Sequence, residues 1–221
     1  MVEVKVPSEF LDEIKTVTKE HQPELSVYEV EGLVILEGIF VVSSPEGEPF
    51  DFYEVLVGVP PEFPRKEPRA IETAKRIPRI ADRHVYPNGG YCCLCIWEEW
   101  LHENPDPSFA NFLTGVMHDY FVSQTYFETR NEWPYGERSH DSPGVVESFS
   151  ELLGVEPDFE VIENYLHALS MGKFKGHNDC PCGSGERIRK CHREQMNQLS
   201  KKILKETALA MLERLRNSRA T

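Results

Sequence analysis

Three successive runs of strand-forming residues between positions 25 and 59 constrain the fold of this 221-residue chain most strongly. The runs cover residues 25–30, 33–42 and 52–59 and are rich in Val, Ile, Phe and Tyr. A Glu-Gly pair separates the first two runs, and a Pro-Glu-Gly-Glu-Pro segment separates the second from the third. Strand-forming runs joined by such turns predict a three-stranded antiparallel meander.

Helical patterns surround this meander. A helix is expected from Ser8, as N-cap, to about residue 21, and the longest apolar stripe predicts a helix from residue 109 to about 128. Four prolines between residues 60 and 68 exclude a helix or a central strand there and predict an extended rim segment. A short strand is expected near 70–73, followed by an irregular stretch to residue 107, and further helices over 145–153, 157–171 and 194–217. The predicted class is α+β, an antiparallel meander sheet flanked by helices.

Composition narrows the cellular setting. Hydrophobic residues make up 40% and charged residues 28%, and no run approaches the roughly 18 apolar residues of a membrane span. The first residues lack the basic and apolar regions of a secretory signal, so we expect a cytoplasmic protein without a membrane partner. A reducing compartment favours metal binding or thiol chemistry over disulfides for the six cysteines.

The charge is acidic overall but uneven along the chain. A net charge of −13 argues against a surface built for nucleic acid. Residues 186–221, however, hold ten Lys and Arg against four Asp and Glu. This basic segment has three open interpretations: it docks the acidic surface of a protein partner, contacts nucleic acid, or is a solvated helix face.

The C-terminal cysteines have the spacing of a metal knuckle. Cys180 and Cys182 form one pair, Cys191 and His192 form another, and a Gly-Ser-Gly turn lies between them. Four such ligands can converge on one tetrahedral Zn²⁺, and four filled positions make the zinc structural rather than catalytic. The segment resembles the SEC-C motif, the zinc knuckle at the C-terminus of the bacterial secretion ATPase SecA and of many other bacterial proteins. We therefore expect a linker over 172–179 and a zinc knuckle with a basic helix over 180–221.

The other cysteines lie in a loop. His84 is followed by a Pro-Asn-Gly-Gly turn and by Cys92, Cys93 and Cys95. Adjacent cysteines do not easily share one metal, so a second metal site is poorly supported. A turn that presents a thiol near an imidazole suits nucleophilic chemistry, although cysteines are also common as small buried residues.

The order of elements around this loop resembles that of the ubiquitin-conjugating (E2) fold over residues 5–150. The family's active-site stretch has the form Tyr-Pro-x-Gly-x-Val-Cys-Leu, which residues 86–94 follow in part. A gapless match makes Cys92 the thioester-forming cysteine, whereas one inserted residue would make it Cys93, which precedes Leu94. His84 stands where the family has Asn, a departure that resembles bacterial E2-like proteins. The E2-like domain is expected over residues 1–171.

The resemblance implies an enzyme that carries a ubiquitin-like protein as a cysteine thioester. It would receive this protein from an E1-like activating enzyme and pass it to an amine on a protein target, in a bacterial pathway such as antiphage defence. His84 could stabilise the oxyanion, and His140 could orient or deprotonate the amine or be a surface residue. The alternative is an inactive E2-like, zinc-containing adaptor that binds a protein or nucleic acid.

Overall fold

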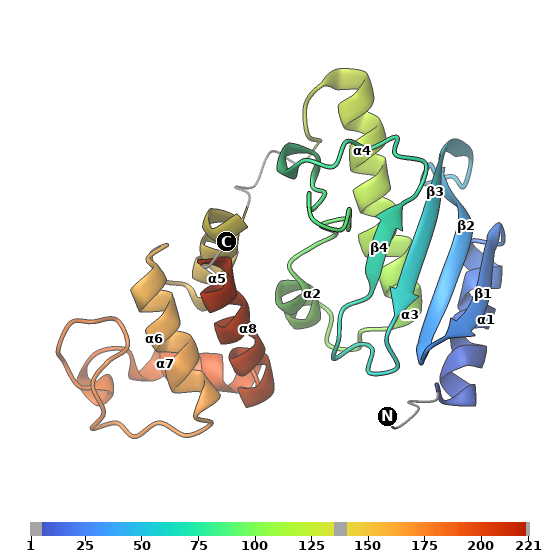
Figure 1. Cartoon of the computed structure of the whole chain (residues 1–221). Coiled ribbons are helices and arrows are strands. Elements are labelled where there is room, and N and C mark those ends of the chain that lie inside the picture. Colours follow the sequence, from blue (N-terminus) through green and yellow to red (C-terminus); the bar gives the residue numbers. More distant parts are fainter. Residues whose placement is uncertain (1–5, 135–140, 220–221) are drawn as a thin grey trace. The chain divides into compact units, whose positions relative to one another are not determined.

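The computed structural model describes residues 6–134 and 141–219, which fall into two compact units (Figure 1). Unit 1 comprises residues 1–95 and 106–137, and unit 2 comprises residues 96–105 and 138–221. A four-stranded antiparallel sheet lies in unit 1, and helices with a Cys/His cluster make up the described part of unit 2. The fold is therefore α+β, as predicted.

The sheet of unit 1 contains the predicted meander. Its strands lie in the order β1 to β4, and each pairs with the next. Leu36, Phe40 and Val57 are fully buried on one face, because alternate side chains of a strand point to the same side. The bounds of the strands are β1 (Leu25–Val30), β2 (Leu33–Ser43), β3 (Pro49–Val59) and β4 (Arg69–Glu72).

Helices cover the buried face of this sheet. In Figure 1, α1 (Ser8–His21) lies behind β1 and α4 (His118–Arg130) lies behind β3 and β4. Phe121 of α4 packs between Phe40 and Tyr53, with ring centroids 5.1 Å and 4.6 Å away. Before α4 come α3 (Phe109–Asn111) and a π-helical segment, η2 (Phe112–Met117), so the predicted helix over 109–128 is present with one widened stretch.

Three details of unit 1 differ from expectation. Ser8 is the first residue of α1 rather than its N-cap, and Pro7 precedes it without a side-chain cap. The proline-rich segment over 60–66 folds into turns rather than an extended strand-like path. After β4 comes a short 3-10 turn, η1 (Ala81–Arg83), which leads into the first cysteine cluster.

Unit 2 has a helical core of its own. Phe149, Tyr165, Leu166, Met196 and Met211 are buried together in one cluster. The helices of this core are α5 (Asp141–Leu153), α6 (Phe159–Ser170), α7 (Arg193–Lys202) and α8 (Lys205–Ser218), with a 3-10 turn, η3 (Ile188–Lys190), before α7. Unit 2 also contains α2 (Trp97–Glu103).

The boundary between the units differs from the predicted one. We expected residues 1–171 to form one domain, but α5 and α6 share their core with α7 and α8. The expected linker, residues 172–179, belongs to unit 2: Phe174 packs against that core, and backbone bonds join Gly176 to Arg189 and Asn178 to Ile188. Burial of apolar side chains, rather than a change in composition, decides which segments belong together.

Two helical regions differ from the prediction. The stretch expected to be irregular contains α2, where Trp97 and Trp100 are buried and stack at 4.5 Å. The expected helix over 194–217 is broken between α7 and α8, because Ile203 and Leu204 adopt extended backbone angles. This break lets Ile203 be buried at 2% exposure while Leu204 stays exposed.

Candidate functional site

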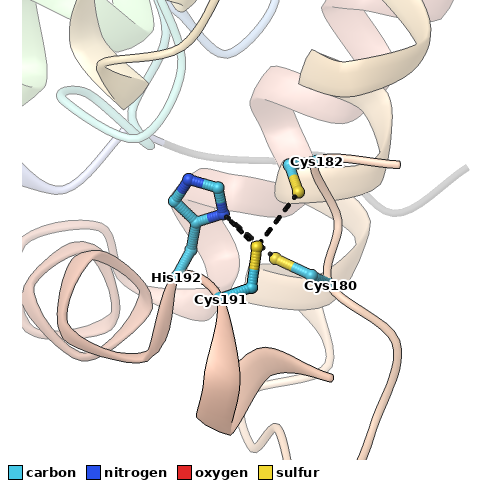
Figure 2. Close-up of side chains that lie close together, drawn as sticks. All are labelled: Cys180, Cys182, Cys191 and His192. Carbon is cyan, nitrogen blue, oxygen red and sulfur yellow. Dashed lines mark hydrogen bonds between the residues drawn. The ribbon is translucent and has the colours of Figure 1, made fainter. Parts of the chain in front are cut away.

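Four predicted metal ligands of unit 2 meet at one point (Figure 2). The ligand atoms of Cys180, Cys182, Cys191 and His192 all lie within 4.8 Å of one another. His192 Nδ1 is 3.2 Å from both Cys180 Sγ and Cys191 Sγ, and Cys182 Sγ is 3.6 Å from Cys191 Sγ. This cluster could bind a metal ion.

A tight turn brings the two ligand pairs together. Asp179 and Arg187 form an antiparallel bridge and also an ion pair at 2.7 Å. Between them, Gly183 and Gly185 have φ angles of 77° and 75°, in the left-handed region that favours glycine. The Gly-Ser-Gly sequence therefore allows the backbone to reverse direction between the two pairs.

One edge of the cluster is part of the core of unit 2. Cys180 and Ile188 are only 4% and 1% exposed, and they belong to the same buried cluster as Tyr165 and Met196. Cys191, in contrast, is exposed. The site thus joins the knuckle to the packing of α6 and α7.

The thiols of this cluster ionise differently. Burial raises the pKa of Cys180 to about 11. Burial also opposes ionisation of Cys182, but hydrogen bonds with Ser184 outweigh it and lower the pKa of Cys182 to about 6. Ser184 Oγ lies 3.2 Å from Cys182 Sγ and 3.4 Å from Cys191 Sγ. The lowered pKa of Cys182 favours its thiolate, the form that binds metals.

The first cysteine cluster lies in unit 1, in a segment that we call the thiol loop (residues 84–95). The loop begins as a hairpin in which Tyr86 N–H donates to Tyr91 O at 2.9 Å. At the base of this hairpin, Cys93 N–H donates to His84 O at 2.8 Å. Cys92 N–H donates to the carbonyl of residue 70 in β4, also at 2.8 Å, so the hairpin is fastened to the edge of the sheet.

The turn of the thiol loop depends on two glycines. Gly89 and Gly90 have φ angles of 93° and 71°. A Cβ atom on Gly90 would lie 2.6 Å from the guanidinium of Arg79, and one on Gly89 would lie 2.7 Å from the ring of Tyr91. Neither position has room for a larger residue without a shift of its neighbours.

Cys92 and Cys93 have different surroundings. Cys92 is only 7% exposed, and burial raises its pKa to about 11, although a hydrogen bond with Tyr120 acts in the opposite direction. Cys93 and Cys95 are both partly exposed. A nucleophile must be accessible and ionised, so these surroundings favour Cys93 over Cys92 as a reactive thiol.

His84 is held on several sides. Its φ and ψ angles of 49° and 43° are left-handed, which is uncommon for a residue with a side chain. The carbonyl of His84 accepts hydrogen bonds from Cys93 N–H and, at 3.1 Å, from Tyr120 Oη. Its ring lies edge-on to Trp133, with centroids 4.5 Å apart. The structure thus brings the backbone of His84 next to Cys93, while His140 lies outside the described residues.

Tyr120 and Gln124 are site residues that sequence reasoning missed. Both are buried on α4, at 6% and 0% exposure. Their spacing gave a signal, because Gln124 continues the apolar stripe one turn after Tyr120 although it is polar. A polar residue on a buried helix face needs a hydrogen-bond partner, and here the partners are Arg83 for Gln124 and His84, the first residue of the thiol loop, for Tyr120.

Comparisons with protein-family models, curated proteins and solved structures find no match to the chain. In the part of the chain that the structure describes, no helix is both long and apolar enough to span a membrane. Residues 6–134 and 141–219 contain one group of His, Cys, Asp and Glu side chains close enough to share a metal ion, the cluster in unit 2. The cysteines of the thiol loop are not part of such a group.

Proposed function

We propose that unit 1 is an E2-like carrier with a ubiquitin-conjugating fold, which holds a ubiquitin-like protein as a thioester on Cys93. The observation that carries this proposal is the thiol loop: a partly exposed cysteine whose amide is hydrogen-bonded to His84, at the edge of an antiparallel meander. The element order supports it as well, because a helix and a meander precede the loop and a long helix follows it. Cys93 takes the role first expected for Cys92, whose burial disfavours reaction.

The proposed chemistry consists of two acyl transfers. In the first, the Cys93 thiolate attacks the thioester carbonyl on an E1-like enzyme, a new C–S bond forms, and the E1 cysteine leaves as a thiolate. In the second, an amine of the protein target attacks, a C–N bond forms, and Cys93 leaves as a thiolate while the amine loses its proton to solvent. His84 is the proposed donor to the oxyanion in both steps.

We also propose that the cluster in unit 2 holds a structural Zn²⁺. A tetrahedral zinc with three sulfur ligands and one nitrogen ligand separates the ligand atoms by about 3.5–3.8 Å. Three of the separations, 3.2–3.6 Å, are close to these values, all four ligand atoms lie within 4.8 Å of one another, and the donor set is soft, which is compatible with that ion. Elemental mass spectrometry should find one zinc per chain, absent in Cys182→Ser and retained in Cys95→Ser; retention of zinc by Cys182→Ser would contradict the assignment.

A second candidate function is an adaptor that binds a protein partner and transfers nothing. The deep burial of Cys92 and the four-ligand cluster in unit 2 favour it. In this case the thiols of unit 1 are structural, and the basic C-terminal segment supplies the contact with an acidic partner.

One experiment separates these functions. The chain is incubated with ATP and its cognate E1-like and ubiquitin-like proteins, and intact mass is measured without reductant for wild type, Cys92→Ala, Cys93→Ala and Cys95→Ala. We expect a hydroxylamine-sensitive adduct that is missing only in Cys93→Ala. Loss only in Cys92→Ala would keep the function and move the site, whereas no adduct in any sample, with E1 shown to be charged, would leave the adaptor.

A further inference from the structure

Two buried side chains on α4 hold two successive carbonyl groups of the chain just before the thiol loop turns. Tyr120 Oη donates to His84 O at 3.1 Å. One helical turn later, Gln124 Nε2 donates to Arg83 O at 2.8 Å. Gln124 is fully buried, and burial of an amide is costly unless it is hydrogen-bonded, so these bonds account for its presence in the core.

The side chains of Arg83 and His84 are also held by α4 and the segment after it. Arg83 donates to Gln124 Oε1 from Nε at 3.2 Å and from Nη2 at 2.8 Å. Its guanidinium lies over the ring of Phe127 at 4.7 Å. Trp133 packs on Phe127 at 4.5 Å and meets the His84 ring edge-on at the same distance. We call Tyr120, Gln124, Phe127 and Trp133 the loop seat.

The loop seat stabilises a backbone conformation that does not form readily by itself. The left-handed conformation is unfavourable for a residue with a Cβ atom, and His84 has this conformation. Such a conformation persists where the surrounding structure holds it in place, and it clusters at functional sites. In this conformation His84 O faces the amide of Cys93 at 2.8 Å, so the loop seat determines where Cys93 lies.

We propose that Gln124 and Tyr120 are positioning residues for thioester transfer, acting through His84 and Cys93 without touching the substrate. This inference rests on the proposed carrier function. The loop seat keeps the His84 imidazole and the Cys93 thiol in one fixed relation, so the amine finds the thioester and its oxyanion donor already aligned. Displacement of reacting groups by about 1 Å can lower a rate by about a hundredfold.

The test compares three variants. Gln124→Met keeps the size of the side chain but removes all its hydrogen bonds to Arg83, and Tyr120→Phe removes one hydroxyl. Tyr53→Phe is the matched control. It removes a buried hydroxyl of β3 that lies 2.9 Å from the hydroxyl of Thr125, which is on α4 but away from the thiol loop. Melting temperature reports how much each change costs the fold.

Two readouts follow each variant: discharge of the preformed thioester to free lysine, and the pH profile of alkylation at each cysteine by peptide mass spectrometry. In Gln124→Met we expect discharge to fall about ten- to hundredfold while thioester formation falls less, and the alkylation profile of Cys93 to shift. Tyr120→Phe should change both readouts in the same direction by a smaller factor. Tyr53→Phe should keep both at the wild-type level.

The outcomes distinguish this inference from the proposed function. If Gln124→Met and Tyr120→Phe lower the melting temperature but leave discharge and alkylation unchanged, the loop seat is merely structural and the inference is overturned. If wild-type protein forms no thioester with charged E1, the carrier function and the role in transfer both fail. In that case, an altered pH profile of Cys93 alkylation in Gln124→Met would still establish that the loop seat positions Cys93.

Discussion

Adjacent residues on an extended segment point to opposite sides, and Cys92 and Cys93 illustrate the consequence. Cys92 faces the interior near Tyr120, and burial raises its pKa to about 11. Cys93 is partly exposed at the hairpin base. A shift of one residue in register would exchange these two environments, so the identity of the reactive thiol depends on the pairing of Cys93 with His84.

We therefore predict unequal alkylation of the two thiols. At pH 7.5, iodoacetamide should modify Cys93 at least about tenfold faster than Cys92, because Cys92 is both buried and protonated. Peptide mapping of native protein after timed exposure measures both rates in one sample. The rates should become similar after denaturation, and faster labelling of Cys92 in the native protein would contradict the assignment.

Asp51 on β3 makes the stability of the fold depend on pH. Burial opposes ionisation of Asp51, but hydrogen bonds from Arg76, at 2.7 and 2.8 Å, and from Thr125 outweigh it and lower its pKa to about 2. A lowered pKa contributes stability above the unfolded value near 4, and this contribution is lost as pH falls from about 4 to about 2.

Urea titrations between pH 2 and pH 7 measure the free energy of unfolding and so test the contribution of Asp51. Asp51→Asn should lower the free energy of unfolding at pH 7 by about 1–2 kcal/mol. The further decrease of this free energy below pH 4 should be smaller than in wild type. Asp12→Asn, an exposed acid of α1, should follow the wild-type curve. If the free energy of unfolding of Asp51→Asn falls between pH 4 and pH 2 as steeply as that of wild type, groups other than Asp51 cause the acid sensitivity.

At the scale of elements, the hairpin of the thiol loop depends on its turn. Gly90→Ala places a Cβ 2.6 Å from the Arg79 guanidinium at a φ of 71°, so we expect a cost of about 1–2 kcal/mol for the backbone alone. Hydrogen exchange of residues 84–93 should accelerate in this variant.

Gly115→Ala is the matched control for that change. Gly115 lies in the helical segment η2, and nothing lies within 4 Å of an added Cβ. Alanine there should be neutral or stabilising by up to about 1 kcal/mol. Equal effects of both substitutions on exchange of the thiol loop would show that the turn does not require glycine at residue 90.

The sequence predicts elements well where a local pattern is enough. The strands of the meander and α1 follow from alternation and helical spacing, and the four metal ligands follow from their spacing. The helix α2 has seven residues, too few to be stable alone, and the burial of its Trp97 and Trp100 is not evident from a local pattern. The burial of Cys92 and the partners of Gln124 likewise depend on long-range pairing that a single sequence does not reveal.

At the scale of the whole molecule, the Cys/His cluster and the core of unit 2 are packed together. Cys180 and Ile188 are buried with the side chains of α6 and α7, and Glu98 of α2 pairs with Arg214 of α8 at 2.5 Å. Metal binding to thiolates supplies folding free energy in small domains. Loss of the metal should therefore affect more than the knuckle.

We predict that a zinc chelator will unfold unit 2 and leave unit 1 folded. Hydrogen exchange should lose protection over residues 96–105 and 141–219, while the strands between residues 25 and 72 keep theirs. Cys191→Ser should reproduce this pattern without chelator, and Cys95→Ser should resemble wild type. Loss of protection confined to residues 180–192 would mean that the helices hold together without metal.

Residues 96–105, which include α2, belong to unit 2 although they lie between the two segments of unit 1 in the sequence. During synthesis, α2 is therefore made well before α5 to α8, the other helices of unit 2. A chain that stops before α5 contains α2 without the rest of its unit. Unit 2 can therefore be completed only after every residue of unit 1 has been synthesised.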